Sequence, residues 1–252
     1  MAINILDRYG IKEVCDFTFY RIEQGGAIGA PVLYLDTLKV STTEQTAENT
    51  SARGGKGNPE LITWDFGKEI NVTLEDALFS AKSMAIMFGS VTADGEADID
   101  TTTNTTKIMR TVPKANVIEA AEGTCKVEIR GTKYSLSNVK YYDANGAIAS
   151  SSTAYAYAVG EMPISEMATI EISPETFPGT YYCTGDTYAR REDNGEDEFF
   201  QLIIPKAKVL SENTLTMEAE GDPSTFSMNL KVLRPATGPM MKLVKYSLTA
   251  AE

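Results

Sequence analysis

Alternating apolar and polar positions run through most of the chain, and this period of two is typical of half-buried β-strands. The alternation predicts strands over residues 14–22, 32–40, 61–66 and 70–74, with a turn at Gly67 between the last two. Later in the chain, the alternating apolar residues are Phe200, Leu202 and Ile204, then Leu215, Met217 and Ala219, then Phe226, Met228, Leu230 and Val232. The pattern therefore predicts a mainly β fold.

One segment has helical spacing instead. Thr73 is a suitable N-cap residue, Asp76 stands three positions later, close to a capping box, and Gly89 can end a helix. The apolar stripe between them consists of Leu74, Ala77, Leu78, Ala81, Ala85 and Phe88. A broad apolar stripe is typical of a helix that packs onto a sheet. We therefore expect one flanking α-helix at about 74–88.

A long polar stretch separates the second and third predicted strands. It covers about residues 41–59, which is longer than most loops of compact domains and far longer than a hairpin needs. Its polar and glycine positions include Thr42, Glu44, Gln45, Asn49, Arg53, Gly54, Lys56 and Gly57. The stretch is expected to be a long inter-strand loop that acts as a linker, as a flap over a ligand, or as an arm that becomes ordered on a neighbouring subunit.

The middle of the chain is less regular than its ends. It combines a Thr/Asn-rich patch at 101–106, a strand-like segment at 126–130 and a turn at Asn145-Gly146 with many tyrosines. We interpret residues 96–190 as a β-rich insertion within one domain, whose core is formed by residues 1–95 and 191–252. No internal repeat of 20–50 residues interrupts this organisation.

Charge and composition narrow the function. The 252 residues carry a formal net charge of −12, with a pI of about 4.6. Such a surface repels phosphates, so specific nucleic-acid binding is not expected. The same charge is compatible with plain solubility or with a conduit through which DNA moves without adhering.

Catalytic chemistry and bound cofactors are not expected. The chain has no histidine, which removes Ser-His-Asp and Cys-His catalysis and histidine-based metal sites. Cys15, Cys125 and Cys183 form no CxxC pair, and reduced thiols are favoured over one disulfide with a leftover thiol. Acidic clusters at 94–100 and 192–198 lack the EF-hand spacing and are interpreted as solvated loops. Residues 54–57, Gly-Gly-Lys-Gly, do not continue as a phosphate-binding loop.

No apolar stretch approaches the roughly 20 residues of a membrane span, and the first eight residues lack the features of a signal peptide. The chain is therefore expected to be made and folded in the cytoplasm.

The arrangement of a strand pair, a long polar stretch, a return strand and an amphipathic helix resembles the tail tube (major tail) proteins of tailed bacteriophages. Residues 199–208, 214–223 and 226–228 resemble the closing strands of that group. The resemblance covers about 12–90 and 198–248. It implies a tail-tube-like β-sandwich or barrel, hexameric rings that stack into a tube, and loop contacts between rings. The middle segment, 96–190, is longer than a minimal tube protein of this group requires, and we expect it to lie on the tube exterior.

The resemblance further implies that the partners are identical copies, together with the tape measure and terminator proteins and, in contractile tails, a sheath. DNA would pass without specific binding, and assembly in the host bacterial cytoplasm would place the protein in the virion tail. An alternative is another β-rich virion component, such as a decoration, adhesin or baseplate protein, which would form no filaments. A carboxylate-based hydrolase is a third hypothesis and would need a pocket with two close carboxyl groups.

Overall fold

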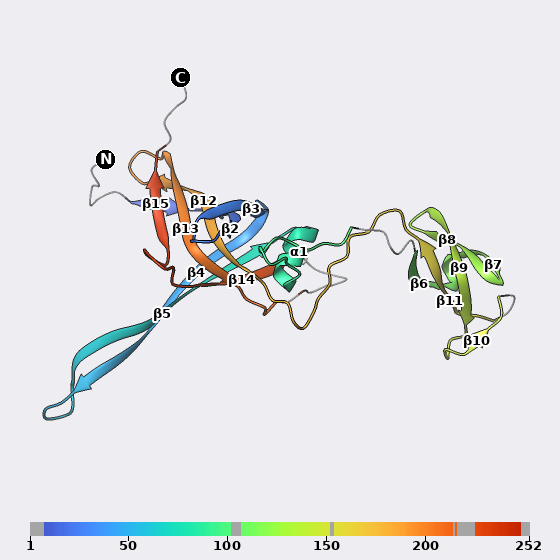
Figure 1. The fold of residues 1–252 in the computed structure, drawn as a ribbon, viewed down its shortest axis with the longest axis horizontal. Helices are drawn as coiled ribbons and strands as arrows, with labels where there is room; N and C mark the ends of the chain where they lie inside the picture. The colour runs from blue at the N-terminus through green and yellow to red at the C-terminus, as the bar shows by residue number, and fades with distance from the viewer. Residues whose placement is uncertain (1–7, 102–106, 152–153, 214, 216–224, 248–252) are drawn as a thin grey trace, which may run out of the picture. The chain divides into compact units, whose positions relative to one another are not determined.

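The computed structural model describes residues 8–101, 107–151, 154–213, 215 and 225–247. The chain divides into two compact units (Figure 1). The first unit consists of Met1–Ile99 and Ile170–Glu252, and the second, here called the inserted unit, consists of Asp100–Thr169. The prediction of a mainly β fold with one helix is confirmed.

The first unit contains one antiparallel sheet in the order β3-β2-β12-β13-β14-β5-β4, with β1 added to β12 and β15 added to β13. Its strands are β1 (Tyr9–Ile11), β2 (Asp16–Ile22), β3 (Ile28–Leu35), β4 (Leu38–Arg53), β5 (Glu60–Asp76), β12 (Thr180–Arg191), β13 (Asp197–Val209), β14 (Phe226–Val232) and β15 (Lys242–Tyr246). The strands predicted from the alternating residues of β2, β13 and β14 are confirmed. The prediction over Met217 and Ala219 lies outside the described residues.

The sheet of the first unit is strongly curled. Strands β3 and β4 lie at opposite ends of the strand order, yet only Asp36 and Thr37 separate them in the sequence. Three Cα–Cα steps span at most about 11 Å, so the two edges must approach each other at Leu35 and Leu38. No hydrogen-bonded ladder joins β3 to β4 among the described strands, so the curl stays open.

The core lies on the inside of this curl. One face of β2, β5, β12, β13 and β14 contributes to it, which is the expected result of period-two alternation, whereas β4 contributes Leu38 alone. Phe17, Phe19, Leu74, Tyr181 and Leu230 are fully buried in it. Phe19 meets the Tyr181 ring edge-on, with 5.9 Å between ring centroids.

The helix prediction is wrong at its amino-terminal end. Strand β5 continues to Asp76, so Thr73 and Leu74 are strand residues. The helix α1 spans Ala81–Phe88, and its N-cap is Ser80, which forms a capping box with Ser83. The pattern misled because Leu74 continues the period of two of Ile70 and Val72 and also stands four residues before Leu78, as in a helix. The end of the helix at Gly89 is confirmed, in the left-handed conformation.

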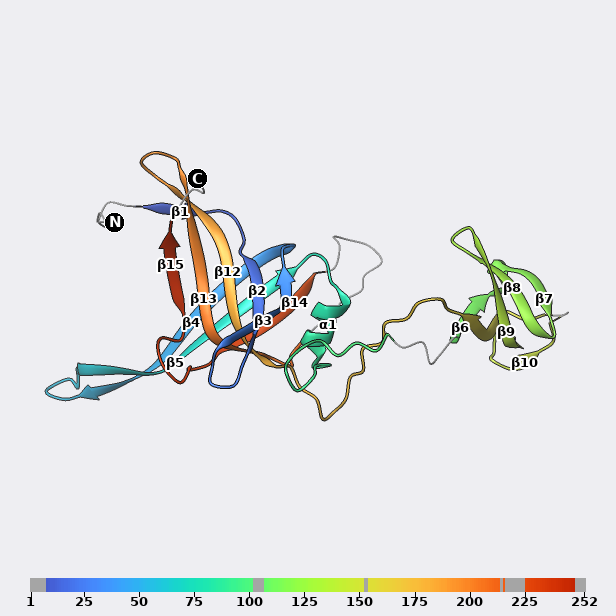
Figure 2. The same cartoon turned by 45° about the horizontal axis from the view of Figure 1, so that its top comes forward.

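The predicted long loop is also wrong. Residues 41–53 belong to strand β4, and the connection to β5 consists of residues 54–59 alone. These polar residues lack the apolar alternation that identifies a strand, and the sequence pattern therefore indicates a loop. The cross-strand ladder of β4 and β5 runs from Leu38↔Asp76 to Arg53↔Glu60. The distal part of this hairpin, residues 46–69, extends away from the rest of the first unit (Figures 1 and 2), and we call it the arm.

The inserted unit contains a second antiparallel sheet, in the order β6-β11-β9-β8-β7, with β10 added to β9. Its strands are β6 (Lys107–Pro113), β7 (Val117–Ala121), β8 (Gly123–Ile129), β9 (Thr132–Tyr142), β10 (Ile148–Ala149) and β11 (Tyr157–Pro163). The edge strands β6 and β7 are joined by the short 3₁₀ helix Lys114–Asn116, so this sheet is curled as well. Val127, Leu136 and Ala158 are buried in its own core.

The boundaries of this unit differ from the expected insertion at 96–190. The strand β12 pairs with β2 and β13, so residues 180–191 are part of the first unit. The residues between Pro163 and Thr180 contain no strand in the structure, although Ile170-Glu171-Ile172 has strand-like alternation.

Candidate assembly surfaces

The arm has one apolar face without a core behind it. Ile62, Trp64 and Phe66 lie on this face and are 54%, 51% and 50% exposed. Their cross-strand partners on β4 are Ala52, Thr50 and Glu48. A two-stranded ribbon is only marginally stable by itself in water, and this ribbon leaves three large side chains half in solvent.

A β-bulge sets which face of the arm is apolar. The apolar residues of β5 occupy even positions on both sides of Gly67, so a regular strand would place them all on the core face. Between the pairs Thr46↔Glu69 and Glu48↔Phe66, β5 has one residue more than β4, and Gly67 takes a φ of 62°. An extra residue reverses the alternation relative to the partner strand. The arm's apolar face is therefore continuous with the polar face of the sheet.

The opposite face of the arm is held by polar contacts. The Glu60 carboxylate accepts hydrogen bonds from the hydroxyls of Ser51 and Thr63, and pairs with the Arg53 guanidinium at 3.2 Å. The hydroxyl hydrogen bonds lower the pKa of Glu60 below its usual range. Arg53 thus has a partner within its own arm.

The structure distributes the predicted loop residues along the hairpin. Thr42 and Glu44 lie near the base of β4, and Gln45, Asn49 and Arg53 lie further along it, all with exposed side chains. The last three of the predicted residues, Gly54, Lys56 and Gly57, form the connection at the tip of the arm, where Gly57 takes a φ of 85°. Sequence reasoning overlooked the apolar face of the return strand as a contact surface, although the alternation of Ile62, Trp64 and Phe66 was the signal for it.

The residues predicted to pack the helix are also dispersed. Leu74 is buried in the core from strand β5, and Ala85 is buried from the helix. Ala77 and Leu78 precede the helix, and Leu78 is 65% exposed. Of the remaining two, Ala81 is exposed and Phe88 is half-buried against the core. The helix also packs through Ile86 and Met87, two positions that the predicted stripe did not include.

A small apolar patch lies beside the start of the helix. Phe79 is 57% exposed, and its ring packs against that of Phe226 with 4.6 Å between the centroids. Together with the exposed Leu78, these side chains rim a shallow cleft that reaches Met84 and Met228. The patch is a second apolar surface of the first unit.

The face of the first sheet that points away from the core is polar and carries carboxylates. Gln201 donates a hydrogen bond to Asp186 at 2.9 Å, and the Tyr34 hydroxyl donates one to Asp16 at 3.4 Å. Asp16, Glu69, Glu75 and Asp186 lie on this face, as the cross-strand registers show. The Lys231 ammonium on the same face is paired with Glu69 at 2.9 Å.

The outer edges of this sheet differ in length. Strand β4 is sixteen residues long and pairs with β5 on one side only, and β3 at the other end of the order has eight residues with Pro31 among them. A proline reduces the capacity of an edge strand to accept another strand. The long edge of β4 is therefore the more open acceptor.

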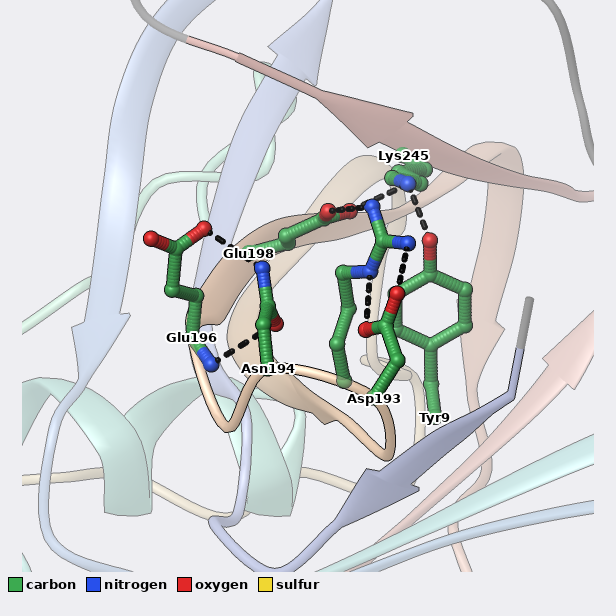
Figure 3. Close-up of polar contacts among 7 residues, drawn as sticks. Tyr9, Asp193, Asn194, Glu196, Glu198 and Lys245 are labelled. Carbon is green, nitrogen blue, oxygen red and sulfur yellow. Dashed lines mark hydrogen bonds and ion pairs between the residues drawn. The ribbon is translucent and has the colours of Figure 1, made fainter.

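The amino-terminal and carboxy-terminal strands meet at one polar cluster. The Lys245 ammonium pairs with the Glu198 carboxylate and donates a hydrogen bond to the Tyr9 hydroxyl (Figure 3). The Arg191 guanidinium contacts Glu198 at 3.4 Å, and Asp193 binds Arg191 in turn. Bonding to Lys245 lowers the pKa of Glu198, and bonding to Glu198 raises that of Lys245. We call Tyr9, Arg191, Glu198 and Lys245 the clasp.

Two further features of the described residues are a cleft on the inserted unit and the acidic turn 192–198. The clefts of the described residues include one of about 360 Å³ on the inserted unit, whose rim carries the ion pair Lys126–Glu119 at 2.6 Å. The acidic turn 192–198 is tied by Arg190, which binds Asp197, and by the clasp. No group of three or more acidic or cysteine side chains in the described ranges is arranged to hold a metal ion. The three cysteines are free thiols.

In the described segments, no helix has the length and hydrophobicity that a membrane crossing requires.

An acidic, curled β-sheet with open edges and a projecting apolar arm is typical of a structural subunit that associates through its sheet. The model of the YomU/Tube protein family matches residues 9–245, nearly the whole chain. The protein therefore belongs to this family of phage tube proteins. A search among curated proteins gives no match. The match includes the inserted unit within its range.

Proposed function

We propose that this phage tube protein polymerises into hexameric rings that stack into the tail tube, the conduit for DNA ejection. The arm is the observation that carries the proposal. The residues that the structure describes do not cover its three half-exposed apolar side chains. Burying them against a neighbouring copy would contribute about 25 cal/mol for each Å² of apolar surface removed from water. We propose that the arm lies against a subunit of the adjacent ring.

The open edges support ring formation. A head-to-tail contact between the edge of β4 in one copy and a different edge of its neighbour is heterologous, and such contacts generate closed rings when the rotation between copies closes. Closure also removes the exposed edges, which would otherwise be sites of uncontrolled association.

The polar face of the first sheet supports the conduit. We propose that this face, with Asp16, Asp186 and Glu75, lines the lumen. Lys208 and Lys242 share this face with Lys231, but Lys231 is paired with Glu69 and Lys208 bonds the Pro178 carbonyl, so phosphates find few free cations there. DNA would then slide past without the counter-charges that bind it.

The other parts of the proposal concern location and partners. The inserted unit would lie on the tube exterior, and the ends of the tube would contact the tape measure, terminator and, in a contractile tail, sheath proteins. The tube would assemble in the host bacterial cytoplasm and remain in the virion tail. We propose no catalytic role and no cofactor.

The single tryptophan of the chain makes the arm directly measurable. Trp64 is the one tryptophan in the sequence, and it is half exposed in the subunit. Polymerisation should move its fluorescence to shorter wavelength in step with the appearance of tubes in negative-stain micrographs. Trp64→Ser should abolish the tubes while changing the free energy of unfolding by no more than about 0.5 kcal/mol.

Asp65→Asn is the matched control, because Asp65 is the next residue on the opposite, polar face of the arm. This variant should form tubes like the parent chain. Tubes of normal length from Trp64→Ser would overturn the proposed role of the arm. Discrete trimers or monomers from the parent chain under all conditions would favour a decoration, adhesin or baseplate protein instead.

A further inference from the structure

The two terminal strands of the described chain are edge strands on opposite sides of one hairpin. Strand β1 pairs with residues Ala189–Arg191 of β12, and β15 pairs with Phe199–Ile203 of β13. Strands β12 and β13 are consecutive and pair with each other. The termini therefore cover two stretches of sheet edge that would otherwise have free backbone donors and acceptors.

One set of side chains binds both terminal strands. Tyr9 lies on β1 and Lys245 on β15, with two strands between them, yet the Lys245 ammonium contacts the Tyr9 hydroxyl and lies 4.5 Å from the centroid of the Tyr9 ring. Tyr9 reaches this position by lying against Phe200, with 5.4 Å between ring centroids. Figure 3 shows Lys245 between Tyr9 and Glu198.

The contact lies at the end of the core face, where the apolar core gives way to a polar cluster. The side chains of Glu198 and Lys245 are 18% and 24% exposed. A charge-assisted pair at this depth is less screened by solvent than a surface pair and loses more when one partner is removed. Three residues of β1 and five of β15 provide few ladder hydrogen bonds of their own. The side-chain cluster is thus a large part of what holds them.

We propose that the clasp couples the two terminal strands, so that β1 and β15 dock on the β12–β13 hairpin together and leave it together. Opening of the clasp uncovers the outer edges of Ala189–Arg191 and Phe199–Ile203 at the same time. The next step rests on the proposed polymerisation: the strand that binds to these uncovered edges comes from a second copy of the chain. The clasp then keeps the edges covered in the dispersed subunit.

Hydrogen exchange of the dispersed full-length chain tests the coupling without any polymerisation. Lys245→Met keeps the length of the side chain and removes its charge. We expect about tenfold faster exchange of the amides of β15 and also of residues 9–11, the equivalent of one lost charged contact. Tyr9→Phe should likewise accelerate exchange in β15, and the double variant should exchange no faster than Lys245→Met alone.

Lys242→Met is the control, because Lys242 is on the same strand, with an exposed side chain on the opposite face. Lys242→Met should leave the amide exchange rates of β1 and β15 unchanged. Lys245→Arg, which keeps the positive charge, should exchange as slowly as the parent chain. Faster exchange of β15 without any change in residues 9–11 would overturn the coupling. Uniformly faster exchange in β2 and β14 would show general destabilisation and would also count against the clasp.

The link to assembly has its own readout. Lys245→Met should lower the protein concentration at which polymers appear, and Lys242→Met should not. Coupled loosening of both strands with an unchanged threshold would retain the clasp and overturn its role in covering acceptor edges. If the parent chain forms no polymers at all, the proposed function fails, while the exchange result on the dispersed chain still decides the coupling.

Discussion

The first unit and the inserted unit are both curled antiparallel sheets in which the two edge strands are consecutive in the sequence. Their charges differ completely. Between Asp100 and Thr169 there are seven basic and seven acidic residues, so the whole formal charge of −12 belongs to the first unit. The two units therefore share a sheet topology but differ in surface charge, and the acidity that is expected of a conduit is confined to the first unit.

The arm and the open sheet edges also distinguish the first unit from the inserted unit. The first unit combines its acidic sheet with the arm and the sixteen-residue open edge strand β4, whereas the edge strands β6 and β7 of the inserted unit have seven and five residues. The inserted unit also has a core of its own. A neutral unit with its own core can be added to a tube subunit without altering the surfaces that we propose for assembly. Four predictions test this comparison.

The largest expected effect is on the separate cores. Phe19→Ala should lower the stability of the first unit by about 3–5 kcal/mol, because the phenyl ring is fully buried between Phe17 and Tyr181. Leu136→Ala should lower that of the inserted unit by about 2–5 kcal/mol. Differential scanning calorimetry should show that each variant moves a different transition. A single transition that both variants shift equally would mean that the units unfold as one.

The C-terminal end of the helix gives the next effect. Gly89 has a φ of 81°, and an added Cβ would approach the Phe177 backbone to 2.9 Å. Gly89→Ala should therefore cost about 2–3 kcal/mol in the first unit, measured by urea denaturation. Gly131→Ala in the inserted unit also has a positive φ, of 79°, but meets nothing within 4 Å, so it should cost less. Equal costs would show that backbone strain alone decides both.

Each unit contains one buried tyrosine whose pKa is raised to about 12 by burial, Tyr181 in the first and Tyr141 in the inserted unit. The folded state keeps the hydroxyl protons at pH values above the usual tyrosine pKa near 10. The stabilisation from each raised pKa is therefore complete below about pH 10 and is lost as the pH rises towards 12. At pH 11, the free energy of unfolding of each unit should be lower by about 1 kcal/mol than below pH 10. Stability curves of Tyr181→Phe and Tyr141→Phe should flatten between pH 10 and 11 in the corresponding transition only.

The smallest expected effect is that of removing the inserted unit. Replacing residues 100–169 by a short Gly/Ser linker should change the free energy of unfolding of the first unit by no more than about 0.5 kcal/mol, because the units have separate cores. The shortened chain should still form tubes. Loss of tubes from a well-folded shortened chain would show that the inserted unit takes part in assembly, which would contradict the proposal that the first unit alone carries the assembly surfaces.

The sequence predicted the parts of this fold that depend on strict alternation. Strand β14, with Phe226 to Val232 alternating, agrees with its prediction because one face is core and the other is solvent. The alternation does not predict the β4 half of the arm as strand. Neither face of residues 46–53 is covered by the described part of the chain, and a strand that lacks a core has no apolar alternation to reveal it. Its partner strand carried the apolar residues instead.

The other candidate surfaces depend on pairing between distant segments. Tyr9, Glu198 and Lys245 are far apart in the sequence, and only the ladders of β1 and β15 bring them together. No local motif marks such a cluster. The sequence pattern does not predict the start of the helix at Ala81 for a local reason: Ser80 and Ser83 form a capping box in which serine replaces the usual Glu or Gln.

The bulge at Gly67 separates two properties of the arm that could otherwise not change independently. Removing two paired residues from each strand near the tip would shorten the reach by about 7 Å and leave the same side chains facing the same way. Inserting one residue into β4 opposite Gly67 would preserve the full reach but turn the distal ribbon over, so that Trp64 would point to the side of the core, whereas deleting Gly67 would remove the bulge and leave Trp64 on its present side. Insertions and deletions in this hairpin therefore have consequences that depend on their parity and on the strand in which they fall.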